Sequence, residues 1–179
     1  MAKVVIDALV ERFKDPVQGD GVTPASPGPG GDDVAWVRRE RLVEVCRFLR
    51  DDPELHFDML HCITAVDYPP TDPKKKADWQ PHLEVIYHLS SMARRHRLVL
   101  KAVLPRWKDN VDGQLPELPS VSGIWKTANW HEREVYDLSG VRFLGHPDLR
   151  RILCPEDWVG HPLRKDYVMP LEYHGIRGR

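Results

Sequence analysis

Residues 82–105 read HLEVIYHLSSMARRHRLVLKAVLP, and this stretch decides the fold. Apolar residues alternate with other residues in two runs, and in a β-strand this alternation places the apolar side chains on one face. The apolar positions are Leu83, Val85, Tyr87 and Leu89 in the first run, and Leu98, Leu100, Ala102 and Leu104 in the second. Only residues 91–96 separate the runs, whereas a parallel crossover needs a dozen or more. The stretch therefore predicts an antiparallel hairpin with one face in a core.

The residues before this hairpin predict two strands separated by a helix. Val34–Val37 is a short apolar run that we interpret as a strand. Helical spacing then follows at Leu42, Val45, Cys46 and Leu49. Asp51-Asp52-Pro53 ends that helix, because proline cannot continue it. Phe57–Tyr68 is rich in β-forming residues and ends on Pro69-Pro70, so we expect a second strand there.

From Ser120 the apolar spacing becomes helical. The expected apolar face consists of Val121, Ile124, Ala128, Val135 and Leu138. Ser120 or Ser122 can cap the start of this helix, and Gly140 fits its end. Prolines then recur every seven or eight residues, at Pro147, Pro155, Pro162 and Pro170. They leave room for one short helix around Asp148–Leu153, so an extended tail is expected.

These patterns predict an α+β fold, in which a mainly antiparallel sheet packs with helices and an extended proline-punctuated C-terminal tail follows. We expect an N-terminal amphipathic segment at 1–14, a Pro/Gly-rich linker at 15–33, an α+β core domain at 34–139 and the tail at 140–179. The linker reads DPVQGDGVTPASPGPGGDD and is poor in large apolar residues, so no packed element is expected in it. Lys74-Lys75-Lys76 is interpreted as the solvated tip of a hairpin rather than a basic patch.

The composition is that of a folded globular protein, with 41% hydrophobic and 30% charged residues. Twenty-six basic and 27 acidic side chains give a formal charge of -1, so no global field favours nucleic acid or an anionic membrane. The three cysteines are far apart and odd in number, which argues against a disulfide framework and suits a reducing compartment. No signal peptide and no stretch of about 20 apolar residues is present, so membrane contact is expected only through partners.

No catalytic or metal-binding motif is complete. The cysteines and histidines lack the paired spacing of a tight metal site, and the phosphate-loop, dinucleotide and nucleophile-elbow motifs are absent. His131-Glu132-Arg133-Glu134-Val135 begins like a zinc-protease motif, but Val135 stands where the second histidine is required.

Three carboxylates lie close together in the expected third helix, but they face different directions. Glu134 lies about 200° around the helix from Glu132. Arg133 and Asp137 are four residues apart and fit an intrahelical ion pair. Glu132 interrupts the apolar stripe, so we expect it to be buried and paired with an arginine or a backbone amide; an unpaired polar group there would cost about 1–3 kcal/mol.

The run WHEREVYDLSGVRFLGHPDLRRILCPEDWVGHPLRKDY, residues 130–167, closely resembles the signature region of the 30-kDa subunit of respiratory complex I, also called the C subunit of NADH:quinone oxidoreductase. The matching positions include Glu132-Arg133-Glu134, Tyr136-Asp137, Gly140, Phe143, Gly145-His146-Pro147, Leu149–Leu153, Asp157-Trp158 and Gly160–Tyr167. A weaker resemblance extends over Val34–Pro170. Ser139 departs from the family, which usually has a bulky apolar residue there.

The resemblance implies a structural, cofactor-free subunit in the peripheral arm of a proton-translocating NADH:quinone oxidoreductase, with no catalytic residue and no metal or cofactor site. NADH, FMN, iron–sulfur clusters and quinone are then bound by partner subunits. The D subunit is the expected principal partner, with the B and I subunits nearby, on the cytoplasmic side of a bacterial inner membrane or the matrix side in a eukaryote. The expected signature and interface residues are Glu132, Arg133, Glu134, Tyr136, Asp137, His146, Arg150, Arg151, His161, Arg164, Lys165, Asp166 and Tyr167.

Three alternatives stay open from the sequence. The first is the equivalent subunit of a related membrane-bound hydrogenase or dehydrogenase, which shares much of this pattern. The second is a free-standing enzyme that uses Glu132, Asp137 and His146, although no complete catalytic set is present. A nucleic-acid-binding module is the third, and neither the charge nor the placement of aromatic residues favours it.

Overall fold

The computed structural model describes residues 2–14, 21–28, 31–70 and 80–177, with side chains from Val5 onward. The lysine run at 74–76 therefore lies outside the described residues. The helices are α1 (Ala2–Arg12), α2 (Leu42–Asp51) and α3 (Ala128–Ser139), with short 3₁₀ turns η1 (Arg39–Arg41) and η2 (Lys108–Asn110). The strands are β1 (Val22–Pro24), β2 (Asp33–Val37), β3 (Met59–Tyr68), β4 (His82–Ser91), β5 (His96–Pro105), β6 (Glu117–Pro119), β7 (Arg142–Leu144), β8 (Glu172–Tyr173) and β9 (Ile176–Arg177).

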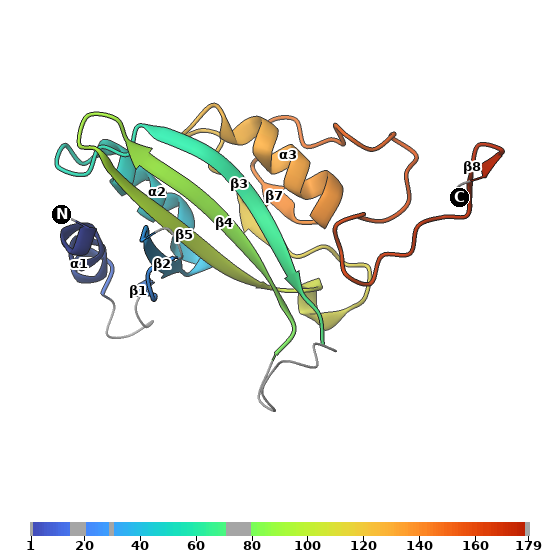
Figure 1. Ribbon diagram of the computed structural model, residues 1–179, viewed down its shortest axis with the longest axis horizontal. Helices are drawn as coiled ribbons and strands as arrows, with labels where there is room; N and C mark the ends of the chain where they lie inside the picture. Colours follow the sequence, from blue (N-terminus) through green and yellow to red (C-terminus); the bar gives the residue numbers. More distant parts are fainter. Residues whose placement is uncertain (1, 15–20, 29–30, 71–79, 178–179) are drawn as a thin grey trace.

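A five-stranded sheet forms the body of the molecule, in the order β1-β2-β5-β4-β3 (Figure 1). The predicted hairpin is confirmed, because β4 and β5 pair antiparallel over their full length, from His82 opposite Pro105 to Ser91 opposite His96. The other predicted strands are also present, as β2 and β3. Strands β2 and β5 pair in parallel, and the remaining neighbours pair antiparallel. The sheet is thus mixed but mainly antiparallel, and the predicted α+β class is confirmed.

The core lies between this sheet and helices α2 and α3, which pack behind it in the view of Figure 1. The inward residues of the central hairpin are at most 1% exposed, and they are those that the alternation predicts. Helix α2 contributes the four residues expected from its spacing, all of them fully buried. On the opposite face of the sheet, Lys101 lies 5.1 Å from the Trp36 ring centroid and pairs with Glu84 at 3.1 Å.

The expectation of a linker without packed elements at 15–33 is wrong for its described residues. Val22–Pro24 forms strand β1 and pairs antiparallel with β2, and Val22 is 1% exposed. Proline is acceptable here because β1 is an edge strand, where a missing amide donor costs little. Leu9 and Phe13 of α1 are also buried in the core. The N-terminal segment therefore packs on the body that was expected to begin near Val34.

Helix α3 begins later than predicted. It starts at Ala128 rather than near Ser120, and its first turn has no side-chain cap. The residues before it form turns, in which Val121 O accepts from the amides of Ile124 and Trp125. These turns bury Trp125, whose indole N–H donates to Phe57 O at 2.9 Å. The predicted end is confirmed, since Gly140 adopts the left-handed conformation with φ 68°.

The short helix expected around Asp148–Leu153 is not formed. The described residues after Gly140 contain only β7 and the small hairpin β8–β9 as regular elements. The amides of Ile152, Leu153 and Cys154 donate to the carboxylate of Asp137, so they cannot donate to carbonyls four residues earlier.

The packing of α1 generates a testable expectation. Leu9→Ala should lower the free energy of unfolding by roughly 2–4 kcal/mol, because it leaves a cavity beneath a fully buried side chain. Asp7→Ala, on the exposed side of the same helix, is the matched control and should change it by less than about 0.5 kcal/mol. Urea denaturation of the full chain measures both. Equal midpoints for Leu9→Ala and the unmodified chain would show that α1 is not part of the core.

Candidate functional site

The signature region forms a junction between the C-terminal end of α3 and the segment that follows β7. The last carbonyl groups of a helix have no partner within the helix, and when the end is buried they need donors from elsewhere. Here the chain returns across the end of α3 (Figure 1). Leu163 N–H donates to Leu138 O at 2.8 Å, and Arg164 Nε donates to Ser139 O at 2.6 Å. The returning segment thus completes the hydrogen bonds of the helix, and we call residues 145–167 the docked segment.

Asp137 makes the densest set of contacts in this junction. Its Oδ2 accepts from the successive amides of Ile152, Leu153 and Cys154 at 2.7–3.0 Å, and its Oδ1 accepts from Arg151 at 2.6 Å. Successive amides that point inward in this way form an anion-binding nest. Burial alone would raise the pKa of the Asp137 carboxyl, but the amides and Arg151 outweigh it and hold the pKa at about 2. The ionised carboxylate therefore anchors the docked segment to α3.

Arg151 and His161 reach the same helix end from the docked segment. Arg151 donates to the backbone oxygens of Asp137 and Gly160 at 3.0 and 2.8 Å. His161 Nδ1 donates to Asp137 O at 2.9 Å. A cationic side chain is favourable here, because the helix macrodipole is negative at the C-terminus. Two signature residues, Arg151 and His161, therefore donate to the same carbonyl oxygen, that of Asp137.

Glycine is required where the docked segment crosses α3. A Cβ atom at Gly140 would lie 2.5 Å from the ring of His161, which is closer than real contacts allow. At Gly160 a Cβ would meet the ring of Tyr167 at 3.0 Å, and φ is +84°. Both glycines therefore permit aromatic rings to pack directly on the backbone.

Arg164 anchors the end of the docked segment. Its guanidinium donates to Ser139 O, Gly140 O and Arg106 O at 2.6, 3.1 and 2.8 Å, and it lies 4.2 Å from the Trp107 ring centroid. The residue is only 5% exposed. Burial lowers the pKa of Arg164 to about 10, so the group remains protonated at neutral pH. A buried cation with this many acceptors fixes the segment in one orientation.

Asp67 of β3 ties the docked segment to the sheet. It accepts two hydrogen bonds from Arg106, at 2.6 and 2.8 Å, and one from Lys165 N–H at 2.8 Å. Burial opposes ionisation, but Arg106 and the Lys165 amide lower the pKa of Asp67. Arg106 also pairs with Asp166 at 3.0 Å. A residue 98 positions earlier in the chain therefore determines where Lys165 lies, and no local sequence pattern reveals this.

Glu132 is fully buried on the opposite side of α3. Its Oε1 accepts from Val121 N–H at 2.7 Å, and its Oε2 accepts from Ser120 Oγ at 2.6 Å. A backbone amide is one of the two partners that the sequence predicts for Glu132, and this prediction is confirmed. Burial raises the pKa of the Glu132 carboxyl to about 7, because the two donors offset the lost hydration only in part.

The predicted ion pair between Arg133 and Asp137 is wrong. Arg133 lies 4.8 Å from the Trp130 ring centroid and approaches Arg150 O at 3.5 Å, while Asp137 faces the docked segment. Helical spacing alone permits the pair, but the nest of amides binds the carboxylate more completely. Glu134 is exposed, as the helical wheel predicts.

The remaining signature residues fall into two groups. His146 is bound within the chain, through Asn129 O and Asp148 N–H, and Tyr136 lies against His161. Tyr167 packs on Gly160. Arg150 pairs with Asp148 at the surface, and Lys165 and Asp166 are also exposed. Only the second group presents charged side chains to solvent.

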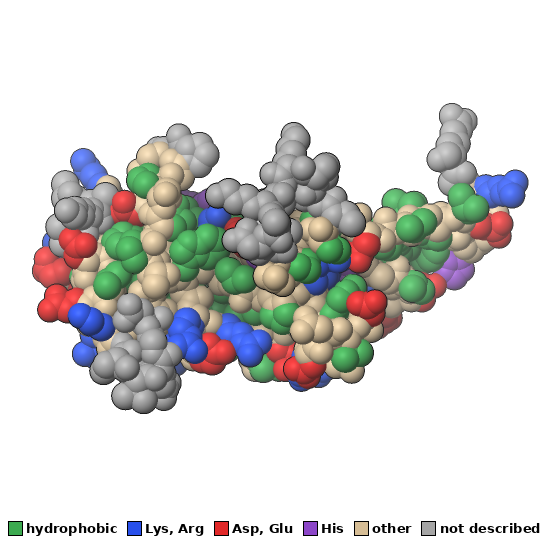
Figure 2. Space-filling model, turned by 90° about the horizontal axis from the view of Figure 1, so that it is seen from below, with side chains coloured by type: hydrophobic (Ala, Val, Ile, Leu, Met, Phe, Trp, Pro, Cys, Tyr) green, Lys and Arg blue, Asp and Glu red, His purple; other side chains and the backbone are tan. Residues whose placement is uncertain are grey.

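Beyond the docked segment the chain continues as a narrow arm (Figure 2). Strands β8 and β9 form its terminal hairpin, and Tyr173 and His174 bind the carboxylate of Asp157 at 2.8 and 2.7 Å. Large hydrophobic side chains on the arm and its approach are 56–85% exposed: Val159, Leu163, Val168, Met169, Leu171 and Ile176. Monomeric proteins rarely expose so many apolar side chains in one region, and such surfaces mark interaction sites.

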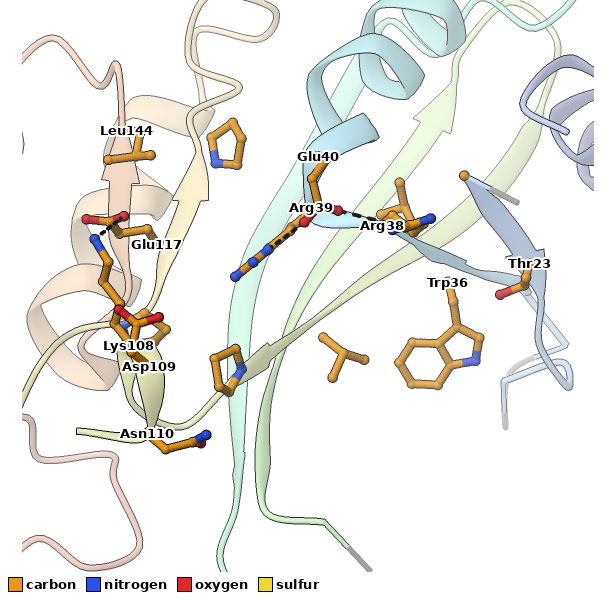
Figure 3. Close-up of a pocket in the computed structure, with 16 residues that line it drawn as sticks. Thr23, Trp36, Arg38, Arg39, Glu40, Lys108, Asp109, Asn110, Glu117 and Leu144 are labelled. Atoms are coloured by element: carbon orange, nitrogen blue, oxygen red, sulfur yellow. Dashed lines mark hydrogen bonds and ion pairs between the residues drawn. The ribbon is translucent and has the colours of Figure 1, made fainter. Parts of the chain in front are cut away.

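A second surface feature is a groove of about 860 Å³ (Figure 3). Arg38–Glu40 line one side, and Lys108 with Glu117 line the opposite side. Val103 and Pro105 of β5 also line the groove. Two ion pairs lie within its walls, Arg39 with Glu40 at 2.7 Å and Lys108 with Glu117 at 2.8 Å. None of the signature residues lines it, so it is separate from the junction.

The described part of the chain contains no group of three or more His, Cys, Asp or Glu side chains placed to hold a metal ion. Across the same residues, none of the helices combines the length and the apolar character that a bilayer span requires.

Comparison with known proteins relates this chain to one family. The family described as "Respiratory-chain NADH dehydrogenase, 30 Kd subunit" matches residues 35–173. The C subunit of NADH-quinone oxidoreductase from Roseiflexus sp. (strain RS-1) is 48% identical over 142 residues, which cover 79% of this chain and 73% of that protein. The protein of the same name from Chlorobium phaeobacteroides (strain DSM 266 / SMG 266 / 2430) is 46% identical over 177 residues, covering 98% and 94%.

Among solved structures, the chain resembles one in the "Structure of the membrane-bound sulfane sulfur reductase (MBS), an archaeal respiratory membrane complex". The TM-score is 0.68, and the match covers 93% of this chain and 85% of the other. The sequence identity is 22%, so this likeness concerns the fold.

The Asp137 nest predicts a large effect on the isolated chain. Asp137→Asn should lower the free energy of unfolding by about 3 kcal/mol, because Arg151 and the amides lose their anionic partner in a buried site. Asp148→Asn, at the exposed pair with Arg150, is the control and should leave it almost unchanged, because solvent screens this pair. Thermal and urea denaturation provide the measurement.

The pH dependence of the same variant tests the charge. The pKa of Asp137 falls from an ordinary 3.8 to about 2 on folding, so its contribution is present above about pH 4 and is lost as the pH falls toward 2. Asp137→Asn should remove that part of the acid transition. An unchanged acid transition in the variant would mean that the carboxylate does not hold the segment.

Proposed function

The chain belongs to the family of the 30-kDa subunit of respiratory-chain NADH dehydrogenase, and from this premise we propose that it acts as the C subunit in the peripheral arm of an NADH:quinone oxidoreductase. In that role it is a component of an oxidoreductase complex and assembles with other subunits of the complex. It supports electron transfer from NADH to quinone by holding that assembly together.

We further propose that this chain is structural and that its neighbours bind NADH, FMN, the iron–sulfur clusters and quinone. The observation that supports this role is that charged signature residues bind groups of their own chain. Asp137, Arg151 and Arg164 each bind backbone groups of the same chain, and together they hold the docked segment on α3. Residues used in this way position a surface rather than a substrate.

The exposed arm is the surface that we propose for the contact with other subunits. Its apolar side chains lie among charged ones, which is the mixture found at protein–protein interfaces. The D subunit is the proposed principal partner, with the B and I subunits as further neighbours. The complex then holds the chain on the cytoplasmic side of a bacterial inner membrane, or on the matrix side in a eukaryote.

A second candidate is the equivalent subunit of a related membrane-bound respiratory complex, which the fold likeness to the sulfane sulfur reductase chain favours. The relatives named NADH-quinone oxidoreductase are far more similar in sequence, at 46% and 48% against 22%. We therefore place the quinone oxidoreductase first.

Affinity purification of the tagged full chain from its native membranes tests this proposal. Mass spectrometry should identify other components of NADH:quinone oxidoreductase among the proteins recovered. Recovery of the large subunit of a nickel hydrogenase, or of sulfane sulfur reductase components, would favour the second candidate instead. Recovery of the tagged chain alone would contradict both.

Substitutions on the arm test which surface is used. Val168→Asp combined with Leu171→Asp should reduce recovery of partner subunits at least about tenfold, because two charges must be desolvated in the contact. The melting temperature of the isolated chain should stay the same, since both side chains are more than 80% exposed. Met92→Asp, in the exposed turn between β4 and β5, is the control and should leave recovery unchanged.

A further inference from the structure

Glu132 is a buried carboxyl group that pairs with no Lys or Arg side chain among the described residues. Its side chain is 0% exposed, and it lies between α3 and the turns that precede the helix. Among the described residues the ionisable group closest to forming an ion pair with it is His146, whose Nε2 lies 4.0 Å from Oε2. The chain places a group that ordinarily ionises where its charge is poorly stabilised.

His146 directs its ring nitrogens to groups other than Glu132. Its Nδ1 accepts from Asp148 N–H at 3.1 Å, so the proton of the ring lies on Nε2, which donates to Asn129 O at 3.0 Å. Both ring nitrogens therefore have partners other than Glu132.

Two neutral groups lie near Glu132 in the described part of the core. Cys46 of α2 and Tyr87 of β4 face it across the core, and both are fully buried. Burial and, secondarily, the nearby carboxylate raise the pKa of the Cys46 thiol and of the Tyr87 hydroxyl, so both groups stay neutral. The Tyr87 hydroxyl makes no hydrogen bond to described groups. From α3 itself, Arg133 points toward Trp130 and the docked segment.

The hydrogen bonds of Glu132 accommodate both of its protonation states. Its Oε2 lies 2.6 Å from Ser120 Oγ, which in turn lies 2.7 Å from Ser122 Oγ. When the group is ionised, Ser120 donates to it. When it is protonated, Oε2–H donates to Ser120 and the serine hydroxyl turns to donate to Ser122. Both serines are half-buried, so this two-hydroxyl chain leads from the core toward the surface.

We propose that Glu132 is a buried proton-binding site that exchanges its proton through Ser120 and Ser122, and that its ionisation weakens the packing of α3 on the sheet. The site is proton-linked because burial favours the neutral acid, and the two donors compensate the ionised form only in part. Alkaline pH then destabilises the helix that carries the docked segment. This inference concerns the chain alone and does not depend on the function proposed above.

The direction of the pH effect follows from the two states. In the unfolded chain Glu132 has an ordinary pKa of 4.5, and burial raises it to about 7 in the folded chain. The stability that the site contributes is therefore complete below pH 4.5 and is lost as the pH rises through 7. The difference corresponds to a change of roughly a few-hundred-fold in the ratio of folded to unfolded chain.

Carboxyl-carbon NMR of the ¹³C-labelled full chain, titrated from about pH 4 to 9, measures the site directly. Glu132 should titrate with a midpoint near 7, and the amide resonance of Val121 should shift with the same midpoint. A Glu132 midpoint below about 5.5 would overturn the proposal, since the carboxyl would then behave as an exposed group. This measurement uses the unmodified chain and so does not depend on a variant that folds.

Variants test the Glu132 carboxyl and the Ser120 hydroxyl separately. In Glu132→Gln the amide mimics the protonated acid, so the roughly 80-fold fall in the ratio of folded to unfolded chain between about pH 5 and 9 should disappear. Glu134→Gln, exposed on the same helix, should retain it. Ser120→Ala should raise the midpoint of Glu132, because the donor that favours the ionised form is lost. An unchanged midpoint in Ser120→Ala, or an unchanged pH profile in Glu132→Gln, would contradict the proposal.

Discussion

The buried C-terminal end of α3 is the constraint on which the arrangement of the signature region depends. Backbone carbonyls removed from water need hydrogen-bond donors, and a helix cannot supply them for its own last turn. Gly140 N–H satisfies Tyr136 O, and the docked segment supplies donors for the next three carbonyls. The segment contains no helix or strand of its own, and its amides at Ile152, Leu153, Cys154 and Leu163 donate to groups of α3.

Two anionic side chains make this docking specific. Asp137 binds three amides that follow one another in the chain, and Asp67 binds the Lys165 amide together with Arg106. A backbone amide donates in one direction, so each carboxylate fixes position and orientation together. Their separation along the docked segment leaves little freedom between the two anchors. This explains why a segment interrupted by prolines can hold one conformation without secondary structure.

Sequence periodicity predicts the body of the fold well, because alternation and helical spacing are local. The central hairpin and the apolar face of α2 follow from it, as does the end of α3 at Gly140. The strand at Val22–Pro24 could not be found this way, since three residues that follow Gly21 and end on a proline gain their order from the edge of β2. The Asp137 nest was missed for a related reason. Helical spacing offers Arg133 as a partner, and only the path of the chain after β7 brings three amides to the carboxylate instead.

The same intrachain contacts bear on how the chain can join a larger complex. A segment that is ordered only on binding loses conformational entropy at that moment, and this lowers the affinity gained per contact. Here the docked segment is held on the body up to Tyr167. Its conformational entropy is therefore lost when the chain folds and not when the chain binds a partner. The arm beyond this segment exposes Val168, Met169 and Leu171, which are the apolar side chains left for a partner to cover. The junction therefore uses charged signature residues, which bind groups of their own chain, to place the apolar residues that follow them.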